Sequence, residues 1–330
     1  MDRRAFITGL GAALALPLAA EAQQTAKGHL VVFFTLNSRV SGSTSSALDG
    51  LKQGFRNLGY VEGRSITLEE RFGEGRREAL AGLAREIVGS QPRAIVTLGT
   101  PATDAAKAAT GTVPIVFIGV GDPVGSGFGA SLARPGSNLT GFSFVGPELA
   151  AKNLEFLKDA FPAIKSVAVL GAGEPDHPLA RAVMAKLGES ALTLGIALQR
   201  VQVPTAEELD AALSGLAGRR PDALLVLNDP VFFANRQRIF AVVARLRVPA
   251  MYQSKELAHD GGLMAYLPSV GEQAVRAADY VDRILKGTRP GDLPIDQPTR
   301  FELVINLKTA NALGLTIPPT LLLRADQVIE

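Results

Sequence analysis

One short pattern occurs three times in this sequence and constrains its fold more than any other feature. An apolar run of strand length ends, a Thr or Asp follows within a few residues, and a proline comes next. The three copies end at Thr100-Pro101, Asp122-Pro123 and Asp229-Pro230. Thr and Asp are good helix N-caps, and proline suits the first helical position because its missing N–H has no partner there anyway. The pattern therefore predicts a strand, a sharp turn and a capped helix start.

Continuous apolar strands that alternate with helices are typical of a parallel sheet covered on both faces. In such sheets ligands bind in the crevice beyond the carboxyl ends of the strands. Three helix N-termini at that crevice would favour a carboxylate or another anion. The fold class that we expect is therefore α/β, with a ligand site at the ends of the strands.

The composition limits what the chain can do. Its 330 residues, 47% hydrophobic and 20% charged, are typical of a soluble globular protein long enough for two domains. The net charge of +2 indicates no nucleic-acid partner and no membrane surface. The absence of cysteine excludes disulfides, thiolate metal sites and a cysteine nucleophile. The three histidines (His29, His177 and His259) have no partner at ligand spacing, and we interpret them as structural or exposed.

The first 22 residues have the pattern of a secretory signal peptide. An arginine pair at 3–4 precedes an apolar stretch at 6–20, and a small-x-small cleavage pattern ends at Ala22. The apolar stretch is too short for a comfortable membrane span, which needs about 20 residues. The arginine pair also resembles a twin-arginine signal, although Asp2 replaces the usual Ser or Thr. We expect cleavage near Ala22 and a product free in the periplasm, by either export route.

Periodicity predicts two consecutive α/β units. In the first, we expect strands at 30–36, 65–71, 94–98, 114–120 and 139–145, and helices at 43–58, 76–89 and between the third and fourth strands. In the second, we expect strands at 166–170, 196–203, 223–227, 249–252, 263–266 and 301–306, and helices at 148–161, 179–194, 206–216, 232–246, 272–285 and 307–313. Two such units in succession predict a two-lobed protein with a cleft.

Several stretches resemble a known family. They are Leu-Gly-Tyr-Val-Glu-Gly at 58–63, Gly-Val-Gly-Asp-Pro-Val-Gly at 119–125, Ser-Leu-Ala-Arg-Pro-Gly at 131–136, Arg-Phe-Glu-Leu-Val-Ile-Asn at 300–306, and the tail 317–330. Through them the chain resembles the substrate-binding proteins of bacterial ABC transporters, specifically the family that includes aromatic-amino-acid-binding members. The resemblance extends over nearly the whole mature chain.

This resemblance implies a type I periplasmic-binding-protein fold, in which the chain crosses between the lobes three times. By analogy, lobe 1 holds 28–141 and 265–295, and lobe 2 holds 142–264 and 296–330. The implied function is the solute-binding component of an ABC importer, a monomer without a membrane span that delivers its ligand to an inner-membrane permease. A ligand-sensing module for a membrane receptor is the alternative, since it would use the same cleft with a different partner.

Catalytic motifs are incomplete or missing. The nearest approach to a G-x-S-x-G nucleophile turn, at 129–133, lacks the last glycine. A dinucleotide-binding G-x-G-x-x-G begins at Gly119, but Val124 stands where the third glycine belongs. Neither a phosphate-binding P-loop nor an H-E-x-x-H zinc motif occurs. The sequence therefore predicts a binding protein rather than an enzyme, with no cofactor and no metal.

The candidate ligand-binding residues lie mostly at or just beyond the ends of the predicted strands. Thr100, Asp122 and Asp229 are explained equally well as helix caps alone. Tyr252 and Tyr266 each offer an apolar face and a polar tip, and are explained equally well by core packing. The full candidate set is Ser43, Ser45, Gly99, Thr100, Pro101, Ala102, Gly121, Asp122, Asn228, Asp229, Tyr252 and Tyr266.

The charges in this set predict a ligand class. Helix N-termini at Thr100, Asp122 and Asp229 suit a carboxylate, while the two aspartates suit an ammonium. Both features together suit a zwitterion, so we hypothesise an amino acid or a similar small amine-carboxylate. The family resemblance adds a preference for an aromatic side chain, with Tyr252 or Tyr266 as its stacking partner.

Overall fold

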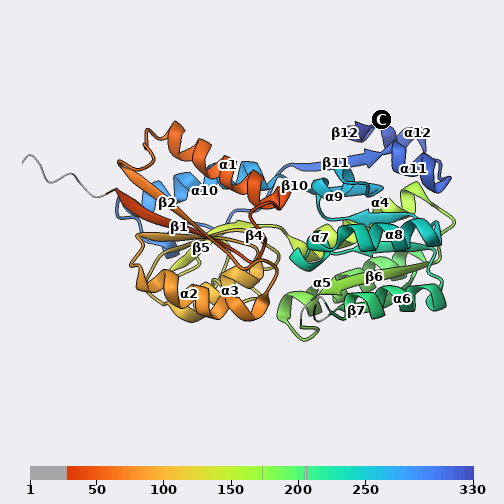
Figure 1. Cartoon of the computed structure of the whole chain (residues 1–330), viewed down its shortest axis with the longest axis horizontal. Helices are drawn as coiled ribbons and strands as arrows, with labels where there is room; N and C mark the ends of the chain where they lie inside the picture. The colour runs from red at the N-terminus through yellow and green to blue at the C-terminus, as the bar shows by residue number, and fades with distance from the viewer. Residues whose placement is uncertain (1–27, 173, 204, 206) are drawn as a thin grey trace, which may run out of the picture.

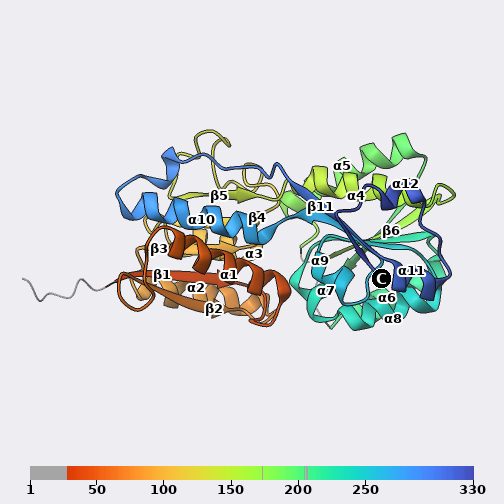
Figure 2. The same ribbon diagram turned by 90° about the horizontal axis from the view of Figure 1, so that it is seen from above.

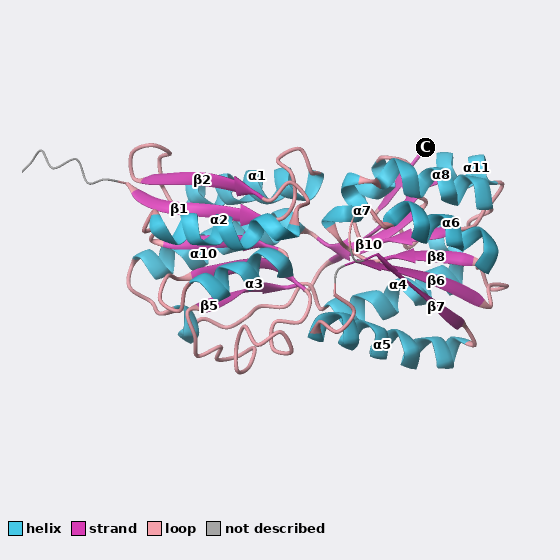
Figure 3. Ribbon diagram, turned by 60° about the horizontal axis from the view of Figure 1, so that its bottom comes forward, coloured by secondary structure: helices cyan, strands magenta, loops and turns pink. Residues whose placement is uncertain are grey.

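The computed structural model of the chain describes residues 28–172, 174–203, 205 and 207–330. The predicted signal peptide lies outside the described residues. Within them, the strands form a five-stranded sheet in the order β2-β1-β3-β4-β5 and a seven-stranded sheet in the order β12-β11-β10-β9-β8-β6-β7. The two sheets form two lobes that lie end to end along the long axis of the molecule (Figure 1). Helices cover both faces of each sheet (Figure 3), which confirms the expected two-lobed α/β fold.

Lobe 1 is built around β1, its first strand. Its strands are β1 (His29–Thr35), β2 (Ile66–Phe72), β3 (Ala94–Leu98), β4 (Ile115–Val120) and β5 (Leu139–Ser143). Its helices are α1 (Gly42–Asn57), η2 (Arg77–Ala79), α2 (Leu80–Gly89), α3 (Thr100–Ala109), α10 (Val270–Leu285) and η3 (Pro290–Asp292). All its strand pairs are parallel, as the continuous apolar runs predict.

Side chains along β1 alternate between two cores. Val31 and Phe33 pack with α1 and α10, whereas Val32 and Phe34 pack with α2 and α3. Although α1 and α10 are far apart in the sequence, they lie side by side (Figures 1 and 2). Their contact is close because α1 presents glycine. A Cβ on Gly54 would lie 2.6 Å from the Cβ of Ala278.

Lobe 2 carries the larger sheet. Its strands are β6 (Ser166–Ala172), β7 (Ala197–Val203), β8 (Ala223–Val226), β9 (Ala250–Tyr252), β10 (Met264–Pro268), β11 (Phe301–Asn306) and β12 (Gln327–Ile329). Its helices are α4 (Gly146–Ala160), α5 (Pro178–Leu194), α6 (Leu209–Arg219), α7 (Pro230–Ala234), α8 (Arg236–Leu246), α9 (Lys255–His259), α11 (Leu307–Leu313) and α12 (Pro319–Leu322). Among the described strands, β10 and β11 pair antiparallel and the other pairs are parallel. Helices α4 and α5 cover one face, and α6 and α8 the other.

Two copies of the strand–proline pattern start helices and one does not. Asp229 caps α7, since its Oδ1 accepts the N–H of Val231 at 2.9 Å. At α3 the cap position belongs to Gly99, whose φ is +84°, so Thr100 is the first helical residue rather than the cap. The prediction that a helix begins at Asp122 is wrong. There the carboxylate accepts the N–H of Gly125 at 2.8 Å and turns follow, as is typical of aspartate in short turns.

The segments that join the lobes also differ in detail from the expected boundaries. The boundary at 141/142 falls inside β5 and that at 264/265 inside β10, and each strand stays paired within one sheet. The first crossing therefore follows Ser143, and the second follows Pro268. We therefore propose a division into lobes that follows the two sheets, with the chain crossing after Ser143 and after Pro268.

Val145 at the first crossing has unusual backbone geometry. It is the residue before α4, and its φ of +46° and ψ of +53° place it in the left-handed region, which β-branched residues rarely adopt. The third crossing runs beside the first, because Phe142 and Asp296 form a parallel bridge. No helix among the described residues is long and apolar enough to cross a membrane.

Candidate functional site

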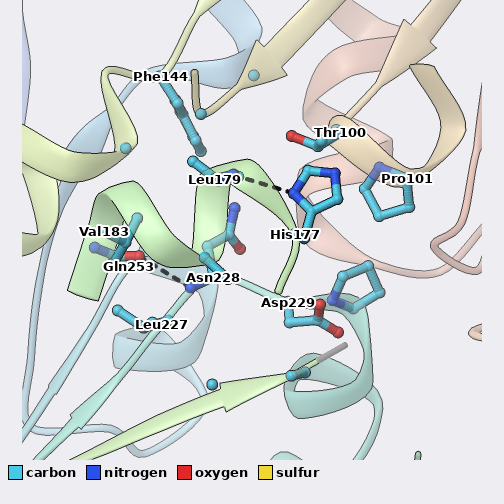
Figure 4. A pocket seen from close by; sticks show the side chains of 18 of the residues that line it. Thr100, Pro101, Phe144, His177, Leu179, Val183, Leu227, Asn228, Asp229 and Gln253 are labelled. Carbon is cyan, nitrogen blue, oxygen red and sulfur yellow. Dashed lines mark hydrogen bonds between the residues drawn. The ribbon is translucent and has the colours of Figure 1, made fainter. Parts of the chain in front are cut away.

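A cavity of about 290 Å³ lies between the two lobes, at the small end of the ~300–1,000 Å³ typical of ligand pockets. The carboxyl ends of strands from both sheets border it (Figure 4), as expected for parallel sheets. From lobe 1 it is lined by Leu36, Asn37, Ser43, Arg77, Leu98, Gly99, Thr100, Pro101, Asp104, Gly119 and Gly121. From lobe 2 its polar and loop lining includes Gly171, Ala172, Glu174, His177, Asn228, Asp229, Phe233, Gln253 and Ser254.

The structure brings part of the candidate set together at this cavity. The candidates that border it are Ser43, Gly99, Thr100, Pro101, Gly121, Asn228 and Asp229. The candidates that do not are Ser45, Ala102, Asp122, Tyr252 and Tyr266. Ser45 is exposed elsewhere, and Ala102 is buried in the core under α3.

Both tyrosines are used in packing. Tyr252 is 1% exposed and meets Phe240 edge-on, with ring centroids 5.7 Å apart, on the face of the sheet opposite the cavity. That burial raises the pKa of Tyr252 above its ordinary value. Tyr266 stacks on Phe301 at 5.4 Å. Neither ring borders the cavity, so the expected aromatic platform is not where the sequence placed it.

The lobe 1 wall is formed by the N-termini of α3 and α1. The positive φ of Gly99 turns the chain sharply from β3 into α3, so that Thr100 and Pro101 border the cavity. Beside them, the side-chain amide of Asn37 donates to the Ser43 hydroxyl at 3.1 Å. The first amides of α3 lack partners within the helix, and its dipole makes this end positive. This wall therefore suits an anionic group.

An ion pair between Arg77 and Asp229 joins the lobes at the cavity. Arg77 lies in η2 of lobe 1, and Asp229 precedes α7 of lobe 2. The Asp229 side chain is 10% exposed and that of Arg77 34%. Burial raises the pKa of Asp229, and this effect exceeds the opposing attraction of Arg77 and the hydrogen bond from Val231. The closed arrangement therefore holds a buried carboxylate that depends on Arg77.

His177 forms a second bridge between the lobes. Its Nε2 lies 3.2 Å from the Oδ2 of Asp104 in α3, and its Nδ1 accepts the N–H of Leu179 at 3.2 Å. Because Nδ1 is an acceptor, the neutral ring carries its proton on Nε2, which donates to Asp104. This bond gives His177 a structural role, one of the two that we expected for the histidines, although its partner Asp104 was not predicted. The position of His177 before Pro178 is a helix-start signal, but the partner is 73 residues away in sequence.

An apolar recess extends from the cavity into lobe 2, between α4, α5 and the sheet. Its walls are Leu149, Val169, Leu179, Val183, Met184 and Leu227. Phe144, from the first crossing, also borders the cavity. Gln253, just after β9, borders it as well, and its Oε1 accepts the N–H of Asn228 at 3.0 Å. Sequence reasoning missed Gln253, although its position after a strand matches the pattern that identified Asn228.

The described residues hold no cluster of three or more His, Asp or Glu side chains that could bind a metal ion. The polar side chains at the cavity instead form pairs between the lobes, as in Arg77–Asp229 and His177–Asp104. An anion-accepting helix end, carboxylates and an apolar recess thus meet in one cavity. Chemically, this arrangement is suited to holding a small zwitterion with an apolar side chain.

Comparisons with known proteins agree with this architecture. A tyrosine-binding protein of Clostridioides difficile (strain R20291) is 25% identical over 275 residues, which cover 82% of this chain and 78% of that protein. The crystal structure of a conserved domain protein from Vibrio cholerae superposes with a TM-score of 0.84 at 28% identity, covering 92% of this chain and 99% of that one. An ABC domain from Streptococcus pneumoniae in complex with L-Trp gives a TM-score of 0.84 at 23% identity, covering 92% and 100%.

A family model identifies the group to which these features point. The model describes the ABC transporter substrate binding proteins, and it matches residues 39–329. That range contains all the described strands except β1, the whole cavity lining except Leu36 and Asn37, and both side-chain bridges between the lobes. The chain belongs to the ABC transporter substrate binding protein family.

Proposed function

We propose that this protein captures an amino acid between its two lobes and delivers it to the permease of an ABC importer. The observation that carries this proposal is the cavity, which is lined from both lobes by groups of complementary chemistry. Family membership supports the role in transport. The predicted signal peptide supports a periplasmic location, and N-terminal sequencing of periplasmic material should begin at Gln23; a start at Met1 would contradict processing.

The carboxylate of the ligand binds at the N-terminus of α3. Thr100 and Pro101 border the cavity there, and Ser43 offers a hydroxyl close by. Backbone amides and the positive end of a helix dipole together form an anion site. The α3 helix has ten residues, so its dipole is well developed at this end.

The ammonium group of the ligand binds to Asp104. Both carboxylate oxygens of Asp229 already have partners, Val231 and Arg77. In the described part of the chain, Asp104 uses one oxygen for His177 and leaves its Oδ1 without a partner. Asp122 does not border the cavity. Asp104 therefore replaces Asp122 and Asp229 as the preferred ammonium partner.

The side chain of the ligand occupies the apolar recess. The recess presents aliphatic side chains from three elements of lobe 2, and such walls favour an apolar or aromatic group. The relative from Clostridioides difficile is named for tyrosine binding, which supports an aromatic side chain for this ligand too. Phe144 and Phe233, rather than Tyr252 or Tyr266, are the phenylalanine rings at the cavity wall.

Calorimetric titration tests this assignment directly. Protein stripped of ligand by unfolding and refolding is titrated with aromatic and aliphatic L-amino acids, and we expect one site per chain. Loss of a charge-assisted bond costs about 1.5–3 kcal/mol, so Asp104→Asn should weaken binding roughly ten- to hundredfold.

Asp122→Asn is the matched control, because Asp122 is also in lobe 1 but lies away from the cavity; its affinity should equal that of the wild type. Equal affinities for Asp104→Asn and the wild type would contradict the ammonium assignment. Folded wild-type protein that binds none of the amino acids would contradict the proposed function.

A further inference from the structure

One polar group at the cavity has no partner and no role in the function proposed above. Gln253 is 6% exposed and borders the cavity. Its Nε2 is shielded from water and makes no hydrogen bond with the described residues. Buried polar groups are nearly always hydrogen-bonded, and each exception needs an explanation.

The orientation of this amide is determined by its neighbour. The backbone N–H of Asn228 is a donor, so the atom 3.0 Å from it must be the acceptor Oε1 of Gln253. The other end of the amide is therefore Nε2, a donor only. Figure 4 shows Gln253 beside Asn228, in the same part of the cavity as Val183 and Leu227. Gln253 thus brings an unpaired donor to the lobe 2 side of the cavity, which Arg200 and Gln202 of β7 also line.

We propose that Gln253 selects ligands whose aromatic side chain ends in a hydrogen-bond acceptor, so that the site prefers a phenol to a plain phenyl or an indole ring. This inference rests on the proposed function and assigns the specificity of the same site. The amide of Gln253 donates from Nε2 to the phenolic oxygen. The bond from Asn228 to Oε1 holds the amide in place, so the donor is oriented before the ligand arrives.

The preference follows from what each ring can offer. A phenolic oxygen accepts a hydrogen bond, whereas a phenyl ring has no acceptor and the indole nitrogen only donates. Phenyl and indole ligands would therefore leave the buried donor of Gln253 unpaired. A site built to bond a ligand hydroxyl discriminates strongly against analogues without it. We expect L-tyrosine to bind ten- to hundredfold more tightly than L-phenylalanine or L-tryptophan, a ratio of the size that one unpaired buried group produces.

The first test needs no variant. Wild-type protein is titrated with L-tyrosine, L-phenylalanine, L-tryptophan and 4-amino-L-phenylalanine, whose amine is mainly a donor. We expect tyrosine to bind at least tenfold more tightly than the other three. Equal affinities for tyrosine and phenylalanine would overturn the role of Gln253 while leaving the proposed function intact. Failure to bind any amino acid would overturn the proposed function itself.

Two variants then assign the preference to this residue. Gln253→Met removes the donor at similar volume, so tyrosine should lose its advantage while phenylalanine affinity changes less than about threefold. Gln253→Glu keeps an acceptor for the Asn228 N–H and replaces the donor by an acceptor. In that variant 4-amino-L-phenylalanine should gain about tenfold relative to phenylalanine. A tyrosine preference that persists in Gln253→Met, or equal loss of both ligands in that variant, would overturn the proposal. Thermal unfolding of each variant at the same temperature as the wild type would show that the variant folds.

Discussion

From the ion pair between Arg77 and Asp229 we predict that replacing Arg77 weakens ligand binding more than replacing Asp229 does. The pair joins the two lobes, so we expect it to form on closure; its two members differ in burial, at 34% and 10% exposed. Arg77→Gln leaves the buried carboxylate of Asp229 without its cation. Asp229→Asn leaves Arg77 able to reach water, and asparagine is still a good cap for α7.

The burial of the two side chains sets the magnitude. Removing one partner of a fully buried pair costs about 3–5 kcal/mol. Because Arg77 is a third exposed, solvent screens the pair, and we take about 2 kcal/mol for Arg77→Gln, which is a roughly thirtyfold loss of affinity. For Asp229→Asn we expect less than about 1 kcal/mol, a loss of no more than about fivefold.

Calorimetry with the tightest-binding amino acid measures both losses. Arg76→Gln is the matched control, since Arg76 is an exposed neighbour that does not border the cavity; it should bind as the wild type does. The double variant Arg77→Gln/Asp229→Asn should recover most of the loss caused by Arg77→Gln. If Asp229→Asn weakened binding more than Arg77→Gln, the reasoning would be refuted, and the Asp229 carboxylate would itself be a ligand-binding group.

Further predictions concern pH, strain, packing and closure. Because burial raises the pKa of Asp229 above 3.8, the folded protein holds that proton more tightly than the unfolded chain. The stability that this proton contributes is fully present below about pH 3.8 and is lost as the pH rises through the pKa of Asp229 in the folded protein. Urea unfolding should therefore show the wild type losing stability relative to Asp229→Asn as the pH rises through this range. A gain in stability would contradict the sign of the shift. Val145→Gly should be about 1 kcal/mol more stable than Val145→Ala, reversing the usual order, because glycine adopts φ of +46° without strain; the usual order in urea titrations would show that Val145 is unstrained. Gly54→Ala should lower the free energy of unfolding by about 1–3 kcal/mol through contact with α10, whereas Gly82→Ala, in open space on α2, should raise it by up to about 1 kcal/mol; equal effects would contradict the close packing. Small-angle scattering should show a smaller radius of gyration with ligand, since closure brings the lobes together; an unchanged radius with bound ligand would count against hinge closure.

The sequence predicted the layers of the fold because they depend on local patterns. Apolar runs such as 94–98 and 115–120 are buried on both faces of the first sheet, which is what continuous hydrophobicity indicates. The helix expected at 307–313 is α11, and Asn306 caps it by accepting the N–H of Thr309. The pattern failed after Asp122, because an aspartate before proline suits a short turn as well as a helix cap. Which of these forms depends on later residues, here Gly125.

The candidate site was predictable only where it follows strand ends. Gly99, Gly121, Asn228 and Asp229 border the cavity because the carboxyl ends of parallel strands meet there. Tyr252 also ends a strand, but alternation directs it to the opposite face, and its neighbour Gln253 borders the cavity instead. A shift of one residue thus separates a core side chain from a cavity side chain.

The bridges between lobes carry no signal in the sequence. Arg77 and Asp229 are 152 residues apart, and Asp104 and His177 are 73 apart. Each residue has an ordinary local explanation, as a helix-start residue or a surface charge. Their pairing depends on how the two lobes approach each other, which no periodicity within one lobe encodes.

A crystal structure of the mature protein grown with L-tyrosine tests the central claim most directly. The claim predicts electron density for one amino acid in the cavity between the lobes, with its carboxylate at the N-terminus of α3, its ammonium on Asp104 and its ring in the apolar recess. Density for the amino acid at any other place, or a well-ordered structure whose cavity holds a molecule of different chemistry in the presence of saturating tyrosine, would contradict it.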